Sequence, residues 1–563
     1  MTLQFELPIY YTKEKQLLEN NIIEDLELLE TNQDDETRDS LLKLIFNPKT
    51  ELGKNLLKKQ VEYFTTNKEY LKETQHIISK WNSKEEKTST KDEFLKLWKD
   101  IKNDEHFIDR YYYVDINYFK FLNKSSLFLQ LLSIYNLMSP VLTLLIPVFL
   151  LIVPFFMLKF MGIKIDVTNY FSILKKVFSK HALGNIFNLT GNIPIEKKVY
   201  ALVSIGFYIF SIYQNVLICY RFFNNFQKIH NNLFMLHNYL KLTIHNCETI
   251  ETMVKNKNTY HLFLQGILEN KSKYNELYEK VKKIKQLSWK NVTSKTCEIG
   301  YVMKLYYDLH TDEEIKNLIE FSFGLNGYKE HMDSLGELYK NKQLNKSKFG
   351  KKMNVVETFN PYLINDNPIK NDIKLDKNII ITGPNASGKT TLLKTVLINQ
   401  IFSQCFGCGF FKKATIPIYD SIHCYLNIPD TSGRDSLFQA EAKRCKQIID
   451  SLEDNKKHFC IFDELFSGTN PTEACASSYG FIKYLNTQKI DFLLTTHLVD
   501  LCKELKNDVK HCNMKVNQIN NFEFDFTYKV EKGISTIKGG LKVLNDLRFP
   551  EQIIKNSCNY LKI

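Results

Sequence analysis

The sequence predicts a multidomain protein with α-helical amino-terminal and middle regions, which include candidate transmembrane helices, and a carboxy-terminal α/β domain. Three observations lead to this fold class. Charged amphipathic patterns typical of helices recur up to about residue 350, two long apolar runs interrupt them, and short strand-like runs alternate with helical ones from about residue 351. A chain of 563 residues is also too long for a single hydrophobic core.

Four regions follow from these patterns. Charged amphipathic helices are predicted for residues 1–123 and again for residues 222–350, where they resemble lever or core helices. A candidate membrane region, 124–221, lies between them, and the α/β domain covers residues 351–563.

The first apolar run extends from Ser125 to Leu158 and contains 34 consecutive residues without Asp, Glu, Lys or Arg. About 20 apolar residues suffice for a helix to span a membrane. Three prolines, Pro140, Pro147 and Pro154, would either kink a single helix or allow a tight re-entrant hairpin. Both alternatives remain open from the sequence.

The second apolar run, Val199–Tyr220, lies between Lys198 and Arg221 and is less apolar, so a helix buried in protein is an alternative to a membrane span. Two simple crossings would place the 159–198 loop opposite both chain ends. That loop holds seven Lys and two acids, which opposes the positive-inside tendency. The number of crossings and their topology therefore remain open.

Composition bears on the kind of partner and on the cellular compartment. The net charge of +12 suits a polyanion, either nucleic acid or an anionic membrane surface, although a Lys-rich solvated surface explains it equally well. Twelve cysteines form no paired framework, and the amino terminus has no secretory pattern. We expect a membrane-associated protein whose α/β domain lies in a reducing compartment, on the cytoplasmic or nuclear side.

A glycine-rich stretch, ITGPNASGKTT, lies between a strand-like run and a helical one. Residues 383–390 fit the pattern G-x-x-x-x-G-K-[ST], and strand–loop–helix is the context that a phosphate-binding P-loop requires. Backbone N–H groups and the helix amino terminus offer partial positive charge to phosphates. Lys389 is expected to reach the β- and γ-phosphates, and the Thr390 hydroxyl to ligate Mg²⁺. The predicted nucleotide-binding residues of this loop are Gly383, Pro384, Asn385, Ala386, Ser387, Gly388, Lys389, Thr390 and Thr391.

Two further strand-like runs end in residues suited to phosphate chemistry. HFCIFDE ends in Asp463 and Glu464, and an acid at a strand end near a P-loop can hold the Mg²⁺ shell. Asp463 is therefore, with Thr390, the predicted metal ligand. Glu464 is then adjacent and able to polarise the attacking water, while His497, at the end of DFLLTTH, can sense the γ-phosphate. We predict an ATP hydrolase with Glu464 and His497 as its catalytic residues.

Taken together, these motifs resemble the ATPase domain of the MutS family of DNA mismatch-repair proteins. ITGPN before the glycine-lysine pair is similar to the usual MutS loop TGPNMGGKST. DELFSGTNPTEA resembles the family's DE-xx-RGT segment, with Ser467 where Arg is usual, and TTH resembles its ATH. The resemblance covers residues 351–563, and implies a P-loop NTPase fold of the MutS or ABC-like kind.

The resemblance implies roles for two more groups of residues. SGRDSLFQAE resembles the serine-rich segment that, in MutS dimers, reaches the partner's nucleotide, and residues 431–441 have no obvious use within their own subunit. The residues implied in this trans-acting segment are Ser432, Ser436, Phe438 and Glu441. The tail resembles the MutS tail, so Tyr528 falls where the family places a ring against adenine, and Ile369 is the candidate for the opposite wall.

For the whole chain, the resemblance implies ATP and Mg²⁺ as cofactors, DNA as ligand in repair, recombination or genome maintenance, and a homodimer or MutS-like heterodimer through the ATPase domains. The first 220 residues do not resemble MutS and contain no recognisable mismatch-reading module. One alternative is a membrane-bound ABC-like ATPase that drives a protein or lipid partner, although the LSGGQ signature is absent. A nucleotide-gated scaffold with negligible turnover is the other.

Overall fold

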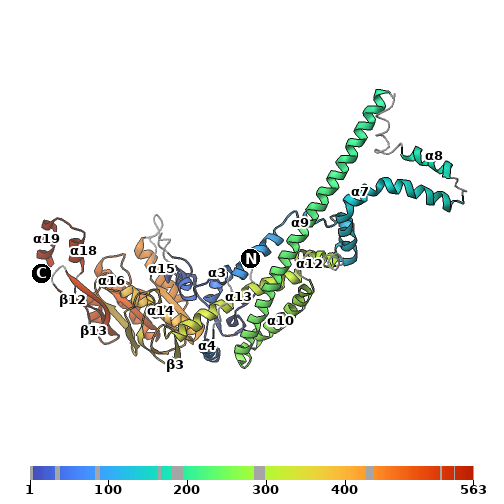
Figure 1. Ribbon diagram of the computed structural model, residues 1–563. Coiled ribbons are helices and arrows are strands. Elements are labelled where there is room, and N and C mark those ends of the chain that lie inside the picture. Colours follow the sequence, from blue (N-terminus) through green and yellow to red (C-terminus); the bar gives the residue numbers. More distant parts are fainter. Residues whose placement is uncertain are drawn as a thin grey trace. The chain divides into compact units, whose positions relative to one another are not determined.

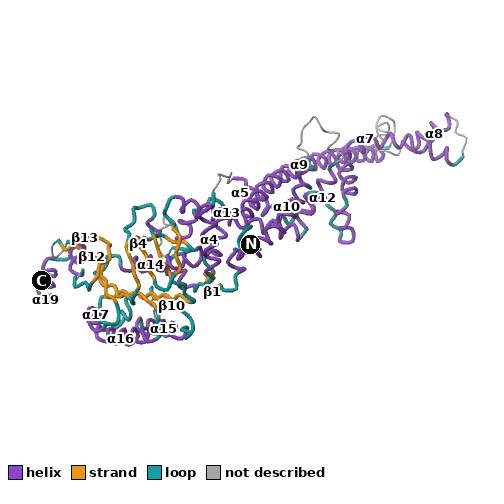
Figure 2. Tube along the Cα trace, turned by 90° about the horizontal axis from the view of Figure 1, so that it is seen from below, coloured by secondary structure: helices purple, strands orange, loops and turns teal. Residues whose placement is uncertain are grey.

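The computed structural model divides the chain into two compact units (Figures 1 and 2). The sheet unit comprises Met1–Thr88, His245–Lys271 and Glu320–Ile563, and the helical unit comprises Ser89–Ile244 and Ser272–Ile319. The predicted regions 1–123 and 222–350 are thus each shared between the two units. The structure describes residues 4–31, 39–82, 89–162, 167–178, 194–284, 298–426, 436–519, 523–537 and 539–561.

The sheet unit contains a six-stranded sheet in the order β13-β12-β6-β11-β10-β9. All neighbouring pairs are parallel except β12 and β13, which pair antiparallel at one edge. This confirms the predicted α/β domain with a mainly parallel sheet. The strands are β6 (Ile379–Thr382), β9 (Ser421–Tyr425), β10 (His458–Asp463), β11 (Asp491–Thr496), β12 (Lys510–Gln518) and β13 (Phe524–Lys532).

Helices follow the strands of this sheet, and local sequence explains where they begin. Asn470 caps the helix that starts at Pro471, a residue whose missing N–H costs nothing at the first helical position. Ser436 and Gln439 form a reciprocal capping box at the start of a second helix, Leu437–Asp450. The helices are α14 (Lys389–Phe406), α15 (Leu437–Asp450), α16 (Pro471–Thr487), α17 (Val499–Glu504), α18 (Gly540–Asp546) and α19 (Glu551–Leu561).

A second, five-stranded sheet has the order β5-β4-β8-β3-β7. Its strand β5 leads into the P-loop strand β6, so the two sheets are joined immediately before the predicted site. Its strands are β3 (Asn345–Phe349), β4 (Met353–Thr358), β5 (Asn371–Leu375), β7 (Cys408–Gly409) and β8 (Lys413–Ile416).

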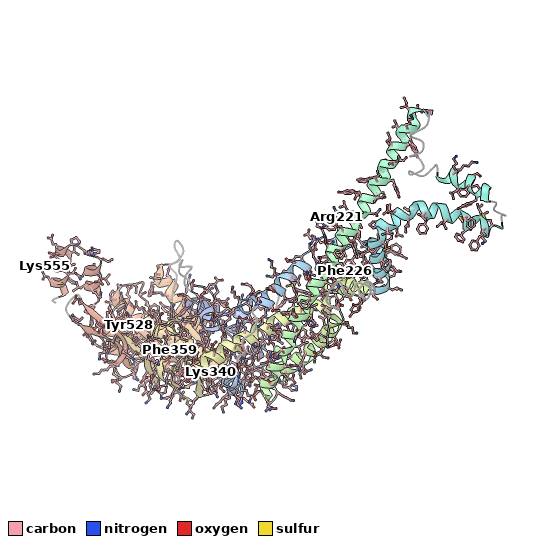
Figure 3. All side chains as sticks on the ribbon, in the orientation of Figure 1. Arg221, Phe226, Lys340, Phe359, Tyr528 and Lys555 are labelled. Atoms are coloured by element: carbon pink, nitrogen blue, oxygen red, sulfur yellow. The ribbon has the colours of Figure 1, made fainter. Side chains whose placement is uncertain are left out.

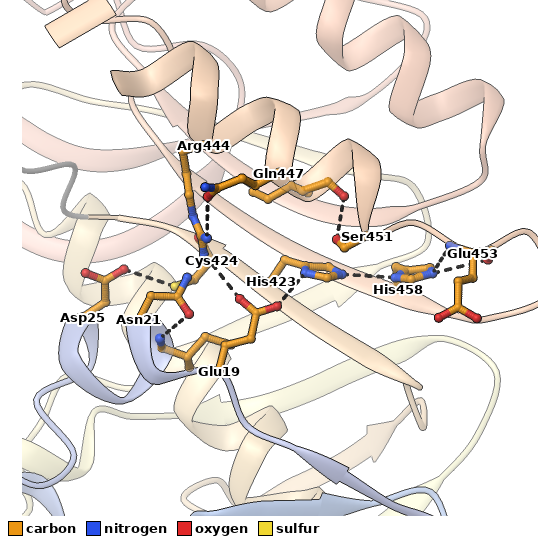
Figure 4. A network of polar contacts seen from close by, with 12 residues as sticks. Glu19, Asn21, Asp25, His423, Cys424, Arg444, Gln447, Ser451, Glu453 and His458 are labelled. Carbon is orange, nitrogen blue, oxygen red and sulfur yellow. Dashed lines mark hydrogen bonds and ion pairs between the residues drawn. The ribbon is translucent and has the colours of Figure 1, made fainter. Parts of the chain in front are cut away.

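The amino-terminal segment belongs to the sheet unit and adds short elements to it. A polar network attaches it to β9, β10 and α15 (Figure 4). The Glu19 carboxylate lies 3.4 Å from His423 Nδ1 and 3.5 Å from Arg444. The elements are η1 (Pro8–Tyr11), β1 (Lys15–Leu17), α1 (Asn20–Asp25), α2 (Leu41–Phe46), α3 (Glu51–Gln60), β2 (Tyr63–Thr65) and α4 (Lys68–Lys80).

The network assigns the protons of two buried histidines. The Glu453 backbone N–H donates to His458 Nε2, so a neutral His458 carries its proton on Nδ1 and donates to His423 Nε2 over 3.1 Å. His423 is then left with a proton on Nδ1 for Glu19. Burial, with His423 beside it, lowers the pKa of His458, which favours this neutral arrangement.

The helical unit contains the two apolar runs (Figure 1). Residues 126–160 form one continuous helix, α7, so the three prolines do not divide this run into a re-entrant hairpin. The second run lies within the 60-residue helix α9. By length and composition, Ser126–Ile146 and Lys198–Val254 could each cross a membrane. The remaining helices of this unit, some of which continue into the sheet unit, are α5 (Ser89–Lys102), α6 (Phe107–Arg110), η2 (Asn117–Lys124), α8 (Val167–Phe178), α9 (Ile195–Val254), α10 (His261–Lys282), α12 (Ile299–Thr311) and α13 (Glu313–Lys340). The short helices η4 (Asn258–Tyr260) and η6 (Pro361–Leu363) belong to the sheet unit.

Candidate nucleotide-binding site

The predicted site residues meet at the carboxyl edge of the six-stranded sheet. Parallel pairing aligns Thr382 of β6 with Thr496 of β11, and Thr495 with Asp463 of β10. The P-loop, Glu464 and His497 follow directly after these strand ends. In open α/β sheets, ligands bind outside the carboxyl ends of the strands, which is the position of this cluster.

The P-loop joins β6 to α14 as the sequence predicts. Gly388 has a φ of 91°, and a Cβ there would meet Tyr528 Cδ1 at 3.0 Å, so glycine is required both by conformation and by space. Ala386 adopts a positive φ of 62°. Within the described part of the chain, the buried Ser387 Oγ has no hydrogen-bond partner. A loop with backbone strain and an unused buried hydroxyl suits a ligand rich in acceptor oxygens.

Lys389 is the cation of the site and is only 5% exposed. Its Nζ donates to the carbonyl oxygens of Gly383 and Pro384, at 3.1 and 3.3 Å. Burial lowers the pKa of Lys389, while the carboxylates of Glu464 and Asp463 oppose that shift. An ammonium desolvated at this depth favours a negatively charged partner, which phosphates supply.

Glu464 and His497 are in direct contact. His497 Nε2 lies 2.7 Å from Glu464 Oε1, and Lys389 Nζ lies 3.1 Å from the same His497 nitrogen and 3.6 Å from Glu464 Oε1. The hydrogen bond from His497 lowers the pKa of Glu464, although burial opposes it. Glu464 also has a positive φ of 51°, a conformation that costs about 1–2 kcal/mol for such a residue. The two predicted catalytic residues therefore lie together, beside the P-loop lysine.

The two predicted metal residues are also in contact. Thr390 Oγ1 donates to Asp463 Oδ2 over 2.6 Å, and Thr495 Oγ1 donates to the other carboxylate oxygen. Hydroxyl and carboxylate oxygens are the ligands that Mg²⁺ prefers. The donor set thus fits this ion.

A cavity of about 420 Å³ adjoins the P-loop. Tyr528 and Ile369, predicted as opposite walls for a base, both line it, together with Glu464. Tyr528 lies on β13, and its ring contacts the position of Gly388. The loop residues that line the cavity are Asn385, Ala386, Gly388, Lys389, Thr390 and Thr391.

The structure adds wall residues that sequence reasoning missed. Phe359, labelled with Tyr528 in Figure 3, Leu363 and Met514 supply apolar surface to the cavity. Asn371 holds the Tyr528 strand in place: its Nδ2 donates to Tyr528 O, and its Oδ1 accepts from Val530 N, both over 3.0 Å. No sequence motif identifies Asn371, because its partners lie more than 150 residues away. The signal that could have identified it was its position two residues after Ile369.

The segment implied to act in trans has contacts within its own chain. Ser432 lies outside the described residues, and Ser436 caps α15. Phe438 packs against Phe466, with ring centroids 5.7 Å apart. Glu441, 2% exposed, accepts hydrogen bonds from Ser467 N, Ser467 Oγ and Gly468 N. The interpretation that residues 431–441 have no use in their own subunit is therefore wrong for Phe438 and Glu441.

Fold and site together define a P-loop nucleotide-binding domain of the ATPase class. Comparison with protein families specifies the type: residues 379–563 match the model described as MutS domain V, and this part of the chain is an ATPase domain of that kind.

Three relatives each match about a third of the chain. The chain is 31% identical over 199 residues to the DNA mismatch repair protein MSH3 of Yarrowia lipolytica, covering 34% of this chain and 19% of that protein. It is 29% identical over 201 residues to MutS protein homolog 4 of Mus musculus, covering 34% and 21%. It is 26% identical over 204 residues to Endonuclease MutS2 of Streptococcus uberis, covering 34% and 25%. The chain thus spans between a fifth and a quarter of the length of these relatives.

Proposed function

We propose that this protein is a Mg²⁺-dependent ATP hydrolase of the MutS type that acts on DNA and is attached to a membrane. The observation that supports hydrolysis is the cluster of Lys389, Glu464 and His497 at one edge of the sheet, beside a cavity of about 420 Å³. Phosphoryl transfer to water uses a P-loop lysine on the phosphates and a residue that orients or deprotonates the attacking water. Lys389 and Glu464 suit these roles, and the His497 imidazole contacts both.

Each side chain has a role that its surroundings allow. Lys389 exchanges its bonds to the loop carbonyls of Gly383 and Pro384 for the β- and γ-phosphates. Glu464, whose pKa is lowered by the hydrogen bond from His497, accepts a proton from the attacking water, and His497 fixes the orientation of the carboxylate. Bound Mg²⁺ would neutralise phosphate charge, and Thr390 and Asp463 are the residues that would hold it.

The DNA part rests on the relatives and on charge. Two of them are named as mismatch repair or MutS homologues, and the net charge of +12 suits a polyanion. Duplex, junction and single-stranded DNA should each be tested with the purified full chain at low salt. Retention that weakens steeply as salt rises supports the proposal, because phosphate contacts release counterions. Failure to retain any of the three contradicts the DNA part alone.

Assembly and location complete the proposal. Dimerisation through the ATPase domains, with a second copy or a related chain, would bring Ser436 near a partner's nucleotide. Sedimentation with and without ATP tests this.

The ATPase domain would work in a reducing compartment, since all cysteines in the described residues are free thiols.

A second candidate is an ATPase that drives a protein or lipid partner at a membrane without any DNA role. It is favoured by the two helices long and apolar enough to cross a membrane. Membrane fractionation followed by DNA binding on the same preparation separates the two candidates, because they share membrane attachment and differ only in DNA retention.

A further inference from the structure

Helix α7 buries polar side chains along one face. Ser133, Asn136, Ser139 and Thr143 are all under 9% exposed and recur every three or four residues, which places them on the same side of the helix. Their hydroxyls are satisfied locally: Thr143 Oγ1, for example, donates to Ser139 O over 2.8 Å. A helix that buries its polar side chains and exposes its apolar ones has the reverse of the pattern expected in water.

This polar face lies against α9. Asn215 Nδ2 donates to Thr143 Oγ1 over 2.9 Å, and Tyr208 OH donates to Thr143 O over 3.2 Å. Further along, Cys219 Sγ lies 3.3 Å from Leu137 O. Later residues of α9 contact earlier residues of α7, so the two helices are antiparallel. We call the contact formed by Ser139, Thr143, Tyr208 and Asn215 the polar seam.

The outer surfaces of both helices are apolar and exposed. Between Leu144 and Leu158 every residue is apolar, and all but one of the side chains described are exposed, so that this part of α7 is apolar all round. Helix α9 shows the same between Val199 and Phe210 on the sides away from α7. The exposed apolar side chains include Leu144, Leu145, Ile146, Phe149, Phe156, Val203, Phe207, Phe210 and Tyr213. Monomeric soluble proteins rarely expose contiguous apolar surface of this extent.

We propose that α7 and the first part of α9 form an antiparallel helix pair in a lipid bilayer, held together by the polar seam and surrounded by acyl chains. In lipid there is no hydrophobic force between helices, so small and polar side chains hold them together while apolar ones face outward. This inference rests on the membrane attachment proposed above and adds which residues face lipid and which hold the pair together.

The dimensions and the flanking charges agree with a bilayer. Ser126–Ile146 has 21 residues, or about 31 Å of helix, close to the thickness of a hydrocarbon core. Lys198 and Arg221, the latter labelled in Figure 3, bracket the uncharged run of α9. The beginning of α7 packs on α12, where Gly300 N donates to Gln130 Oε1 over 2.7 Å, so one side of its first turns is covered by protein and not by lipid.

The test uses the wild-type full chain reconstituted in phosphatidylcholine vesicles. A lipid-soluble carbene precursor is photolysed in the bilayer, and labelled residues are identified by peptide mass spectrometry. We expect labelling of Leu144, Phe207 and Phe210 to exceed that of Thr143 and Asn215 at least fivefold. Labelling of all sides alike would overturn the polar seam while leaving membrane attachment intact.

Absence of label from both helices would overturn membrane attachment and this inference together. A water-soluble oligomer in the same preparation would then identify a second copy as the cover of the apolar surfaces. ATP turnover is measured on each sample, since it depends on the sheet unit and reports failure of the hydrolase proposal separately.

A matched pair of variants sharpens the test. Asn215→Leu removes the bond to Thr143 without adding charge, and should raise the labelling of Ser139 and Thr143 at least threefold. Tyr213→Leu, two residues away on the exposed side, should leave that labelling unchanged. Equal labelling of the seam in both variants and in the wild type would contradict its role in holding the helices together.

Discussion

The nucleotide site and the α7–α9 pair both bring polar side chains together, but of opposite kinds. The site gathers ionisable side chains, Lys389, Glu464 and His497, within 3.6 Å of one another. The polar seam gathers neutral ones, Thr143, Tyr208 and Asn215, inside an apolar exterior. Charged side chains that contact one another but can still take a further ionic partner suit an ionic ligand. Neutral side chains that satisfy one another's hydrogen bonds suit helices with no water around them. A cluster of polar side chains therefore does not by itself identify a ligand; the charge of its members does.

Removing the carboxylate of the site should have the largest effect. Glu464→Gln keeps the size of the side chain but cannot accept a proton, so phosphate release should fall by about 10²–10⁴-fold, the usual contribution of a general base. ATP binding, measured by equilibrium titration, should remain, because Lys389 and the P-loop are unchanged.

Glu504→Gln, on the exposed end of α17, is the matched control and should keep wild-type turnover. Unchanged phosphate release from Glu464→Gln would instead favour the nucleotide-gated scaffold, in which ATP is bound but not turned over.

Lys389→Ala tests whether the buried cation of the site serves a phosphate. A hydrogen bond to a charged group contributes about 1.5–3 kcal/mol, so the Kd for ATP should rise by roughly 10- to 150-fold. Lys394→Ala removes a lysine from the same helix that faces Glu27 at 3.6 Å, and should leave ATP affinity within twofold. If both variants bind ATP equally well, the phosphates do not lie at Lys389.

A pH dependence of stability is expected from His331 of the sheet unit and not from the polar seam, whose four residues include no histidine. His331 is fully buried, accepts from Gln60 Nε2 and lies 3.0 Å from Gly53 O, and burial lowers its pKa from 6.5 to about 3. The unfolded chain binds one more proton between these values. Stability should thus fall by about 1.4 kcal/mol per unit as pH drops from about 6.5 towards 3.

Urea unfolding of the full chain at pH 7, 6 and 5 measures this slope. His331→Gln should reduce it by the contribution of one proton, while His261→Gln, at an exposed position, should not. An unchanged slope in His331→Gln would show that folding does not lower the pKa of His331.

The sequence predicted the site better than its surroundings, for a physical reason. P-loop, Asp463, Glu464 and His497 follow strands that parallel pairing aligns at one edge, so local patterns suffice to bring them together. Glu441 is bonded to Ser467, 26 residues further along the chain, and Glu19 contacts His423, about 400 residues away. No local sequence pattern predicts such tertiary contacts. The polar seam could not be predicted either, because hydropathy identifies an apolar run but not the side of the helix that faces another helix.

The smallest effect is expected at Asn371, which lines the edge of the cavity and holds the Tyr528 strand beside it. Asn371→Ala removes two neutral hydrogen bonds, to Tyr528 O and from Val530 N, each contributing about 0.5–1.5 kcal/mol. Because Tyr528 has a positive φ of 54° that these bonds help to hold, its ring should lose its fixed position over the cavity. Steady-state kinetics should show KM for ATP raised about threefold to tenfold, with kcat within twofold. Asn371→Asp keeps only the acceptor, so its KM should lie between those of the wild type and Asn371→Ala. A fall in kcat at constant KM would mean that Asn371 acts on the chemical step and not on the wall of the pocket.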